Sequence, residues 1–290
     1  MKFANQIGCS TNCYHGFDLK TALRGIAGAG FQNVELASVR DYTEHVMPEQ
    51  MSERDREDLR VTLKDYGLSP MSISGHSNLA SREGVDNFKR RVDLAKWFGA
   101  AVVNTGPGEV ESPEGREGFF TNILEIAQYA DQAKVTVALE THGELMGSGT
   151  AAASVIEQID SPWIRMNYDT GNVIFYGDVN PREDIAAAIP FLGHIHLKDK
   201  RGGKKVWDFP PLGMGDVDFP GIFNALDRAH YRGPISVEIE VSGKDYIPSW
   251  LVSDEKGEIL SEEKESHGPE IVDRALEESL HYIQSLLSTG

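Results

Sequence analysis

The sequence is poor in cysteine and lacks any long apolar run. Two of its 290 residues are cysteines, Cys9 and Cys13, which is too few for a disulfide framework or a cysteine-based zinc cluster. We interpret them as ordinary reduced thiols. The N-terminal residues lack the apolar core of a secretory signal, and no segment approaches the ~18 apolar residues of a membrane span. These absences predict a soluble, cytoplasmic protein.

Basic residues are also scarce. The chain has 28 Lys and Arg against 45 Asp and Glu, a formal net charge of −17. Nucleic acids and anionic membranes bind through clusters of Lys and Arg, so neither is expected as a partner. The charge is compatible with a neutral polyol or sugar and a divalent cation. It could equally serve solubility alone.

A third absence is the glycine fingerprint of dinucleotide-binding folds. No G-x-G-x-x-G motif opens a helix after the first predicted strand. The two glycine-rich triplets, Gly106-Pro107-Gly108 and Gly213-Met214-Gly215, are most simply turns, with a phosphate cradle as the alternative.

Short β-branched runs alternate with longer stretches of helical periodicity along the whole chain. The predicted strands are residues 3–8, 33–36, 69–74, 101–104, 135–140, 164–169, 193–197 and 235–240. The predicted helices begin near Asp18, Ser52, Val85, Gly115, Thr150, Pro181 and Phe219, and a last one spans residues 269–287. Eight strand–helix pairs predict parallel strands that close into a barrel.

We therefore expect an α/β fold, a (β/α)8 TIM barrel in a single domain over residues 1–290. An open doubly wound sheet is the alternative. Two connections are longer than the ~4–6 residues usual in compact domains, namely residues 39–50 and a loop insertion at about 241–268. Both follow strands, at the end of the barrel where such enzymes keep their sites. We interpret them as substrate covers or as contacts of a possible homo-oligomer.

The last four predicted strands carry metal-binding side chains at or near their ends. Glu140 and Asp169 end two of them, and His196 and Glu238 lie near the ends of the next two. In a parallel barrel these ends meet on one face. A lone glutamate at a strand end is more often a salt-bridge partner, but four such residues in register are hard to explain that way. Three converging carboxylates need a counter-charge, which a divalent cation supplies.

The donor set indicates which ion to expect. One imidazole and three carboxylates form a hard, oxygen-rich site, which favours Mn²⁺ foremost, with Mg²⁺ and Co²⁺ next and Zn²⁺ still open. We therefore predict one divalent metal ion bound by Glu140, Asp169, His196 and Glu238.

Several short motifs resemble the xylose isomerase-like TIM barrels, the sugar phosphate isomerase/epimerase superfamily that includes ketose 3-epimerases and inosose dehydratases. The matching pieces are Leu-Glu-Thr-His-Gly at 139–143, Asp-Thr-Gly-Asn at 169–172, His-Ile-His-Leu-Lys-Asp at 194–199, Leu-Gly-Met-Gly-Asp-Val-Asp-Phe-Pro at 212–220 and Gly-Pro-Ile-Ser-Val-Glu at 233–238. The resemblance implies the same four ligands, with Glu140 and Glu238 also acting as the catalytic acid and base.

Strand periodicity leaves one ligand open. Residues two apart face the same way, so Glu240 rivals Glu238 as a ligand, and His194 lies beside His196 with a structural role. His142 shares the face of Glu140 and is a candidate second catalytic base or substrate contact.

Other polar residues near strand ends are candidates for substrate binding or for structural support. They are Glu35, His76, Asn104, Asn172 and Lys198. For Lys198 the alternative is a surface ion pair. Trp207 and Trp250 could stack on a sugar ring or be buried in the long loops.

The chain departs from the ketose 3-epimerase pattern at Asn172. The resemblance implies a histidine three residues after the aspartate ligand, where this chain has asparagine. Our first hypothesis is a metal-dependent isomerase or epimerase that removes a proton beside the carbonyl of a keto-sugar or related polyol. The second is a metal-dependent lyase, either a dehydratase or an enzyme of β-elimination on a 3-keto-glycoside. The third is a non-catalytic binding barrel.

Overall fold

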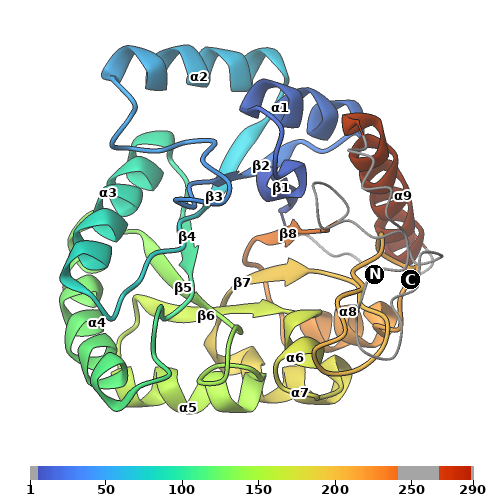
Figure 1. Ribbon diagram of the computed structural model, residues 1–290. Coiled ribbons are helices and arrows are strands. Elements are labelled where there is room, and N and C mark those ends of the chain that lie inside the picture. The colour runs from blue at the N-terminus through green and yellow to red at the C-terminus, as the bar shows by residue number, and fades with distance from the viewer. Residues whose placement is uncertain (1–5, 241–267, 289–290) are drawn as a thin grey trace, which may run out of the picture.

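Eight short strands form one closed parallel sheet in the computed structural model, which describes residues 6–240 and 268–288. Each strand pairs with the next along the chain, and β8 pairs with β1. Helices surround the strands on the outside (Figure 1). The prediction of a (β/α)8 barrel in one domain is confirmed, and the open-sheet alternative is wrong.

The strand bounds explain which side chains reach the mouth of the barrel. They are β1 Ile7–Ser10, β2 Asn33–Ala37, β3 Ser69–Ser74, β4 Val102–Thr105, β5 Thr136–Glu140, β6 Ile164–Asp169, β7 Leu192–Leu197 and β8 Ile235–Val237. The six strands from β2 to β7 lie within one residue of the predicted bounds. The first strand ends at Ser10 instead of residue 8, and the last ends at Val237 instead of residue 240. Glu238 and Glu240 therefore follow β8.

Helices fill the connections. They are α1 Leu19–Gly28, α2 Glu53–Asp65, α3 Arg82–Phe98, α4 Pro113–Ala133, α5 Gly149–Ile159, α6 Asn172–Phe175, α7 Pro181–Ala188, α8 Phe219–Arg228 and α9 Pro269–Ser288, with short 3₁₀ turns η1 Thr11–Tyr14 and η2 Ile189–Phe191. Ser52 opens α2 through a capping box with Asp55. Ser81 caps α3, which explains why this helix begins three residues before Val85. The single turn α6 was not predicted.

The long connection after β2 is anchored to α3. The buried Arg91 side chain donates from Nε to the carbonyl of Ser38 and lies 3.5 Å from a carboxylate oxygen of Glu49. Val39 and Thr43 form an antiparallel bridge within the connection. Of the predicted insertion at 241–268, residues 241–267, with Trp250, lie outside the described residues. No helix among the described residues is long and apolar enough to cross a membrane.

Candidate metal centre and cavity

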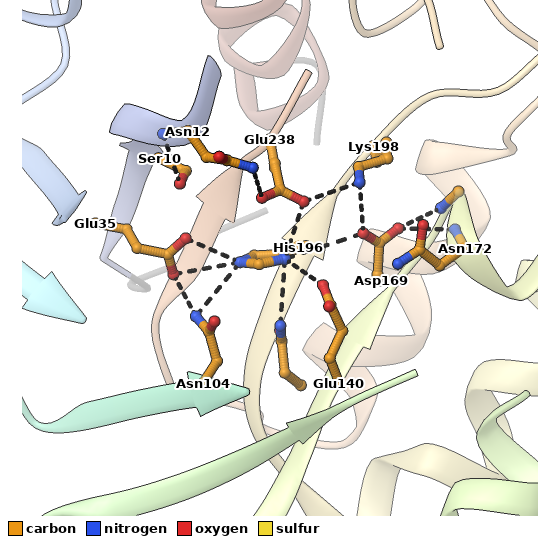
Figure 2. Close-up of polar contacts among 12 residues, drawn as sticks. Ser10, Asn12, Glu35, Asn104, Glu140, Asp169, Asn172, His196, Lys198 and Glu238 are labelled. Carbon is orange, nitrogen blue, oxygen red and sulfur yellow. Dashed lines mark hydrogen bonds and ion pairs between the residues drawn. The ribbon is translucent and has the colours of Figure 1, made fainter. Parts of the chain in front are cut away.

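The four predicted metal ligands converge at the mouth of the barrel. Glu140 and Asp169 end β5 and β6, His196 lies on β7, and Glu238 directly follows β8. Each offers a ligand atom, and these atoms all lie within 4.8 Å of one another. Figure 2 shows the imidazole of His196 at the centre, with the carboxylates turned toward it.

The two ring nitrogens of His196 have different surroundings. Nδ1 faces the carboxylates, at 2.9 Å from Glu140 Oε1, 3.3 Å from Glu238 Oε2 and 3.9 Å from Asp169 Oδ2. Nε2 lies 3.0 Å from Glu35 Oε1 on the opposite side (Figure 2). A carboxylate that accepts one ring N–H fixes the tautomer and leaves the other nitrogen available to an ion.

For Glu35 and Asn104, which we expected to bind substrate or to give structural support, the structure favours support. Both are fully buried behind the His196 ring, away from the residues that line the cavity. Glu35 Oε2 accepts hydrogen bonds from Asn104 Nδ2 at 2.6 Å and from Ser72 Oγ at 2.9 Å. The structure thus assigns Glu35 to holding the histidine, and Asn104 to holding Glu35.

His194 lies beneath the same carboxylate. It is fully buried, hydrogen-bonded to Ser72 and Asn167, with Nε2 3.2 Å from Glu35. Burial lowers the pKa of His194 to about 4 despite that neighbour. This placement fits the structural role we assigned to it.

Asp169 has one oxygen bound by the backbone and one directed at the cluster. Oδ1 accepts the N–H groups of Gly171 and Asn172, both at 2.8 Å. Oδ2 is buried without a hydrogen-bond partner in the described part of the chain, although Lys198 Nζ lies 3.2 Å away. Burial, together with Glu140 and Glu238, raises the pKa of Asp169 to about 7 against the opposing effect of Lys198.

Lys198 is buried and forms no surface ion pair. Its Nζ lies 2.9 Å from Glu238 Oε2 and 2.7 Å from Glu240 Oε1. Although burial acts in the opposite direction, Asp169 and Glu238 raise the pKa of Lys198 well above its usual value. Glu240 is thus paired with the lysine and stands outside the ligand cluster, whereas Glu238 belongs to both.

The charges of the cluster suit a divalent ion. Against the effect of burial, Glu238 and Glu35 raise the pKa of His196 well above its ordinary value. Lys198 and His196 hold the pKa of the Glu238 carboxyl well below the ordinary value for glutamate. The positive charges of protonated His196 and Lys198 thus balance the negative carboxylates. A metal cation could take the place of the proton on His196 Nδ1. The oxygen-rich donor set fits such an ion, and so does Asp169 Oδ2, which accepts no hydrogen bond from the described residues.

A cavity of about 270 Å³ opens above the cluster. Glu140, Lys198, Glu238 and Glu240 form its charged floor. Around them lie polar side chains, Asn12, His76, His142 and Asn172, and an apolar and aromatic wall, Val39, Tyr42, Phe175, Tyr176, Trp207 and Phe209. Of the expected substrate contacts, His76, Asn172 and Lys198 therefore reach the cavity.

Two histidines of the cavity contact neighbouring side chains. His76 Nδ1 accepts the N–H of Gly106 at 3.3 Å, which leaves Nε2 to donate to Glu140 Oε2, also at 3.3 Å. His142 Nε2 lies 2.7 Å from the hydroxyl of Tyr176. Desolvation in the cavity lowers the pKa of His142, although the residue as a whole is exposed. Both could exchange protons or hydrogen bonds with a ligand.

Both glycine-rich triplets lie in loops and have local roles, and a turn is present at Gly213 but not over residues 106–108. Gly106 supports His76, as above. In the loop after β7, the N–H groups of Gly213 and Gly215 both donate at 2.8 Å to Asp199 Oδ2, and that of Val217 donates to Asp199 Oδ1. The site that an external phosphate could occupy is therefore filled by the chain's own carboxylate.

Sequence reasoning missed Asn12, which donates from Nδ2 to Glu238 Oε1 at 3.0 Å. Asn12 follows β1 by two residues, so a correct end for that strand would have placed it at the mouth. It also missed Tyr176, which belongs to the region of the unpredicted turn α6, and Phe209.

Known proteins are similar to this chain in sequence or in fold. The curated L-ribulose-5-phosphate 3-epimerase UlaE of Escherichia coli (strain ATCC 8739) is 26% identical over 225 residues, covering 72% of this chain and 78% of that protein. A xylose isomerase-like TIM barrel protein from Mycobacterium smegmatis, solved in complex with magnesium, superposes with a TM-score of 0.75 at 20% identity, covering 100% and 99% of the two chains. The D-allulose 3-epimerase from Methylomonas sp. superposes with a TM-score of 0.71 at 20% identity, covering 99% and 100%.

The family model for the xylose isomerase-like TIM barrel matches residues 23–264, most of the chain. The motifs at the ends of β5 to β8 had indicated this family from the sequence. The chain belongs to the xylose isomerase-like TIM barrel family.

Proposed function

We propose that this protein is a divalent-metal-dependent sugar epimerase or isomerase that acts on a keto-sugar or related polyol. The observation that carries the proposal is the convergence of Glu140, Asp169, His196 and Glu238 in one cluster, of which Glu140 and Glu238 also line a small cavity. The epimerase activities named for the relatives from E. coli and Methylomonas sp. support it. The cavity, at about 270 Å³, is smaller than the ~300–1,000 Å³ of sites for drug-sized ligands and suits one sugar unit.

The proposed ion is Mn²⁺, with Mg²⁺, Co²⁺ and Zn²⁺ as alternatives, held by the three carboxylates and His196 Nδ1. Such an ion would polarise a ketose carbonyl and acidify the neighbouring C–H group. The magnesium complex of the M. smegmatis protein is compatible with an oxygen-rich site of this kind.

Glu140 and Glu238 are the proposed acid/base pair. Glu140 ends β5 and Glu238 follows β8, so they approach the cavity floor from different sides of the barrel (Figure 2). One carboxylate removes the proton beside the carbonyl, and the other returns a proton to the opposite face or to the neighbouring carbon. His76, which contacts Glu140 Oε2, orients one member of the pair.

The substrate we propose is an unphosphorylated sugar. Among the described residues that line the cavity, Lys198 carries the positive charge, and three carboxylates already surround it. Asp199 occupies the N–H groups of the glycine turn after β7. A phosphate dianion would therefore meet Glu238 and Glu240 beside a lysine that is already paired with carboxylates. A ketose should show a higher kcat/KM than its terminal phosphate, and the reverse order would contradict this part of the proposal.

Solvent-exchange measurements test the function. When the Mn²⁺-loaded protein is incubated with a panel of ketoses in D₂O, NMR should detect deuterium incorporated at the carbon beside the carbonyl. Glu140→Gln and Glu238→Gln should each abolish that exchange, and Glu157→Gln on the exposed face of α5 serves as the matched control. Full exchange in either site variant would remove that residue as an essential base.

A lyase is the second candidate, because His142 and Lys198 reach the cavity beside the carboxylate pair. Either could protonate a departing hydroxyl or glycosyl oxygen after the same proton abstraction. The NMR panel separates the two outcomes, since an epimerase yields an isomer and a dehydratase yields a product one water lighter.

A further inference from the structure

We propose that Asn12 is a positioning residue for Glu238, and that the β2–α2 connection, residues 38–52, holds Asn12 in place through Thr43. The inference rests on the proposed metal-dependent function and names part of the machinery for that site. Asn12 and Glu238 are 226 positions apart in the sequence and meet where the barrel closes between β1 and β8.

The two oxygens of Glu238 have separate partners. Oε2 faces His196 Nδ1 at 3.3 Å and Lys198 Nζ at 2.9 Å, on the side of the cluster. Oε1 accepts the hydrogen bond from Asn12 Nδ2 at 3.0 Å, as Figure 2 shows. Asn12 thus fixes the rotation of the carboxylate about its last bond and determines which oxygen faces the cluster.

The orientation of the Asn12 amide follows from its neighbours. A carboxylate accepts hydrogen bonds only, so Nδ2 must face Glu238 and Oδ1 must face away. Oδ1 then accepts the hydroxyl proton of Thr43 at 2.6 Å. Since that hydroxyl has one proton, the 2.9 Å contact between Thr43 Oγ1 and His15 Nδ1 requires the ring nitrogen to donate. The direction of each hydrogen bond is therefore assigned: His15 donates to Thr43, Thr43 to Asn12, and Asn12 to Glu238.

Backbone contacts bring the same turn to Glu238 independently of the Asn12 side chain. The Cys13 thiol, one residue further along η1, lies 3.6 Å from the carbonyl of Val237 and accepts the N–H of Ile239 at 3.3 Å. These two residues flank Glu238. Ser10 Oγ accepts the N–H of Asn12 at 3.2 Å and holds the turn at its start. Two consecutive residues of η1, Asn12 and Cys13, are thus attached around this one carboxylate.

The connection that supports Asn12 also lines the cavity. Val39 and Tyr42 reach the cavity wall, and the Tyr42 ring stacks on His15 with centroids 4.0 Å apart. Residues that would contact a sugar are therefore connected, through Thr43 and Asn12, to a proposed ligand and base. Partners of metal ligands of this kind typically contribute about 10–100-fold to metal affinity or activity.

Calorimetric titration of chelator-treated protein with Mn²⁺ tests the inference. Asn12→Ala should weaken Mn²⁺ binding about 10–100-fold. Thr43→Val, which keeps the shape and removes the hydroxyl, should weaken it by roughly threefold or more, and the double variant should bind no more weakly than Asn12→Ala alone. Asn122→Ala is the matched control, because Asn122, on the outer helix α4, donates from Nδ2 to the carbonyl of Leu79 at a similar distance of 2.9 Å.

The outcomes separate this inference from the function on which it rests. Wild-type affinity in Asn12→Ala, or effects of the two substitutions that multiply in the double variant, would overturn the positioning role while leaving the metal site intact. If Asn12→Ala does not fold, unchanged Mn²⁺ affinity in Thr43→Val alone would overturn it. A wild-type protein that binds no divalent ion would overturn both proposals.

Discussion

Replacing the buried Glu35 by glutamine should destabilise the fold and weaken metal binding, because Glu35 supports the His196 ring on the side away from the cluster. Oε1 lies 3.0 Å from His196 Nε2, and Oε2 receives Asn104 Nδ2 and Ser72 Oγ. Both oxygens therefore face donors. The NH₂ group of a glutamine, whichever way the amide turns, would point at one of them and leave a buried group unsatisfied.

The magnitude follows from the ionisation of Glu35. His196 lowers the pKa of this carboxyl from 4.5 to about 2 against the effect of burial. A difference of that size corresponds to roughly 3 kcal/mol in favour of the folded, ionised form, comparable with the ~3–5 kcal/mol lost when a buried ion pair loses one partner. Because the pKa is lowered on folding, this stabilisation is present above pH ~4.5 and is lost as the pH falls toward 2.

Urea unfolding of the chelator-treated protein near neutral pH measures the effect, and Mn²⁺ titration of the folded variant measures the consequence for the site. Glu35→Gln should lower the free energy of unfolding by about 3 kcal/mol and weaken Mn²⁺ binding about 10–100-fold. Glu125→Gln is the control. Arg82 and Lys89 lower the pKa of that carboxyl to about 2 as well, but the group is exposed, so the loss should stay below about 1 kcal/mol. Equal losses in the two variants, or unchanged Mn²⁺ binding in Glu35→Gln, would refute the reasoning.

Three further predictions concern the cluster itself. Glu238→Gln should weaken Mn²⁺ binding about 100-fold or more, and Glu240→Gln should weaken it less than about tenfold, because Glu240 pairs with Lys198 outside the cluster. If calorimetry gives the reverse order, Glu240 and not Glu238 is the metal ligand. Mn²⁺ affinity should fall as the pH is lowered from about 8 to about 6, by roughly tenfold per pH unit for each proton that binding releases. The reason is that burial raises the pKa of Asp169 to about 7 and that the neighbouring carboxylates raise the pKa of His196. Calorimetric titration at several pH values would show a flat profile if neither group loses a proton. Lys198→Met should destabilise the chelator-treated protein by roughly 3–5 kcal/mol. Added Mn²⁺ should raise the melting temperature of this variant more than that of the wild type, because the ion supplies the missing positive charge. Equal increases in the two melting temperatures would contradict this prediction.

The architecture could be predicted closely because hydrophobic periodicity and helix caps act locally. The bounds of β3 and β6 match the prediction residue for residue, and Ser52 and Pro181 begin helices where capping and ring geometry favour them. The errors arise where a local signal is weak. A single turn such as α6 buries too little to leave a periodic pattern. Its start is held by a local contact, the Asp169 carboxylate on the N–H groups of Gly171 and Asn172, at a residue that we had interpreted as a metal ligand.

Depth inside the barrel is the part of the site that the sequence did not reveal. Glu35 and His76 are both polar residues near strand ends, yet the first is fully buried behind His196 and the second reaches the cavity. Strand periodicity tells which face a side chain takes, but its height depends on the register of neighbouring strands around the barrel. The register shifts between Val34 and Glu35 and again between Met166 and Asn167 are not visible in either strand alone.

The choice between Glu238 and Glu240 shows why charge has to be considered together with geometry. Alternation along a continuous strand would place both carboxylates on the same face, which leaves the sequence unable to rank them. The strand ends at Val237, so alternation no longer governs either residue, and Glu238 alone of the two lies in the cluster around His196. This lysine is buried and needs more than one carboxylate to remain charged, and it takes Oε1 of Glu240 along with Oε2 of Glu238. Glu240 thus neutralises the cation that would otherwise draw Glu238 away from the cluster, and Asn12 holds the remaining oxygen of Glu238.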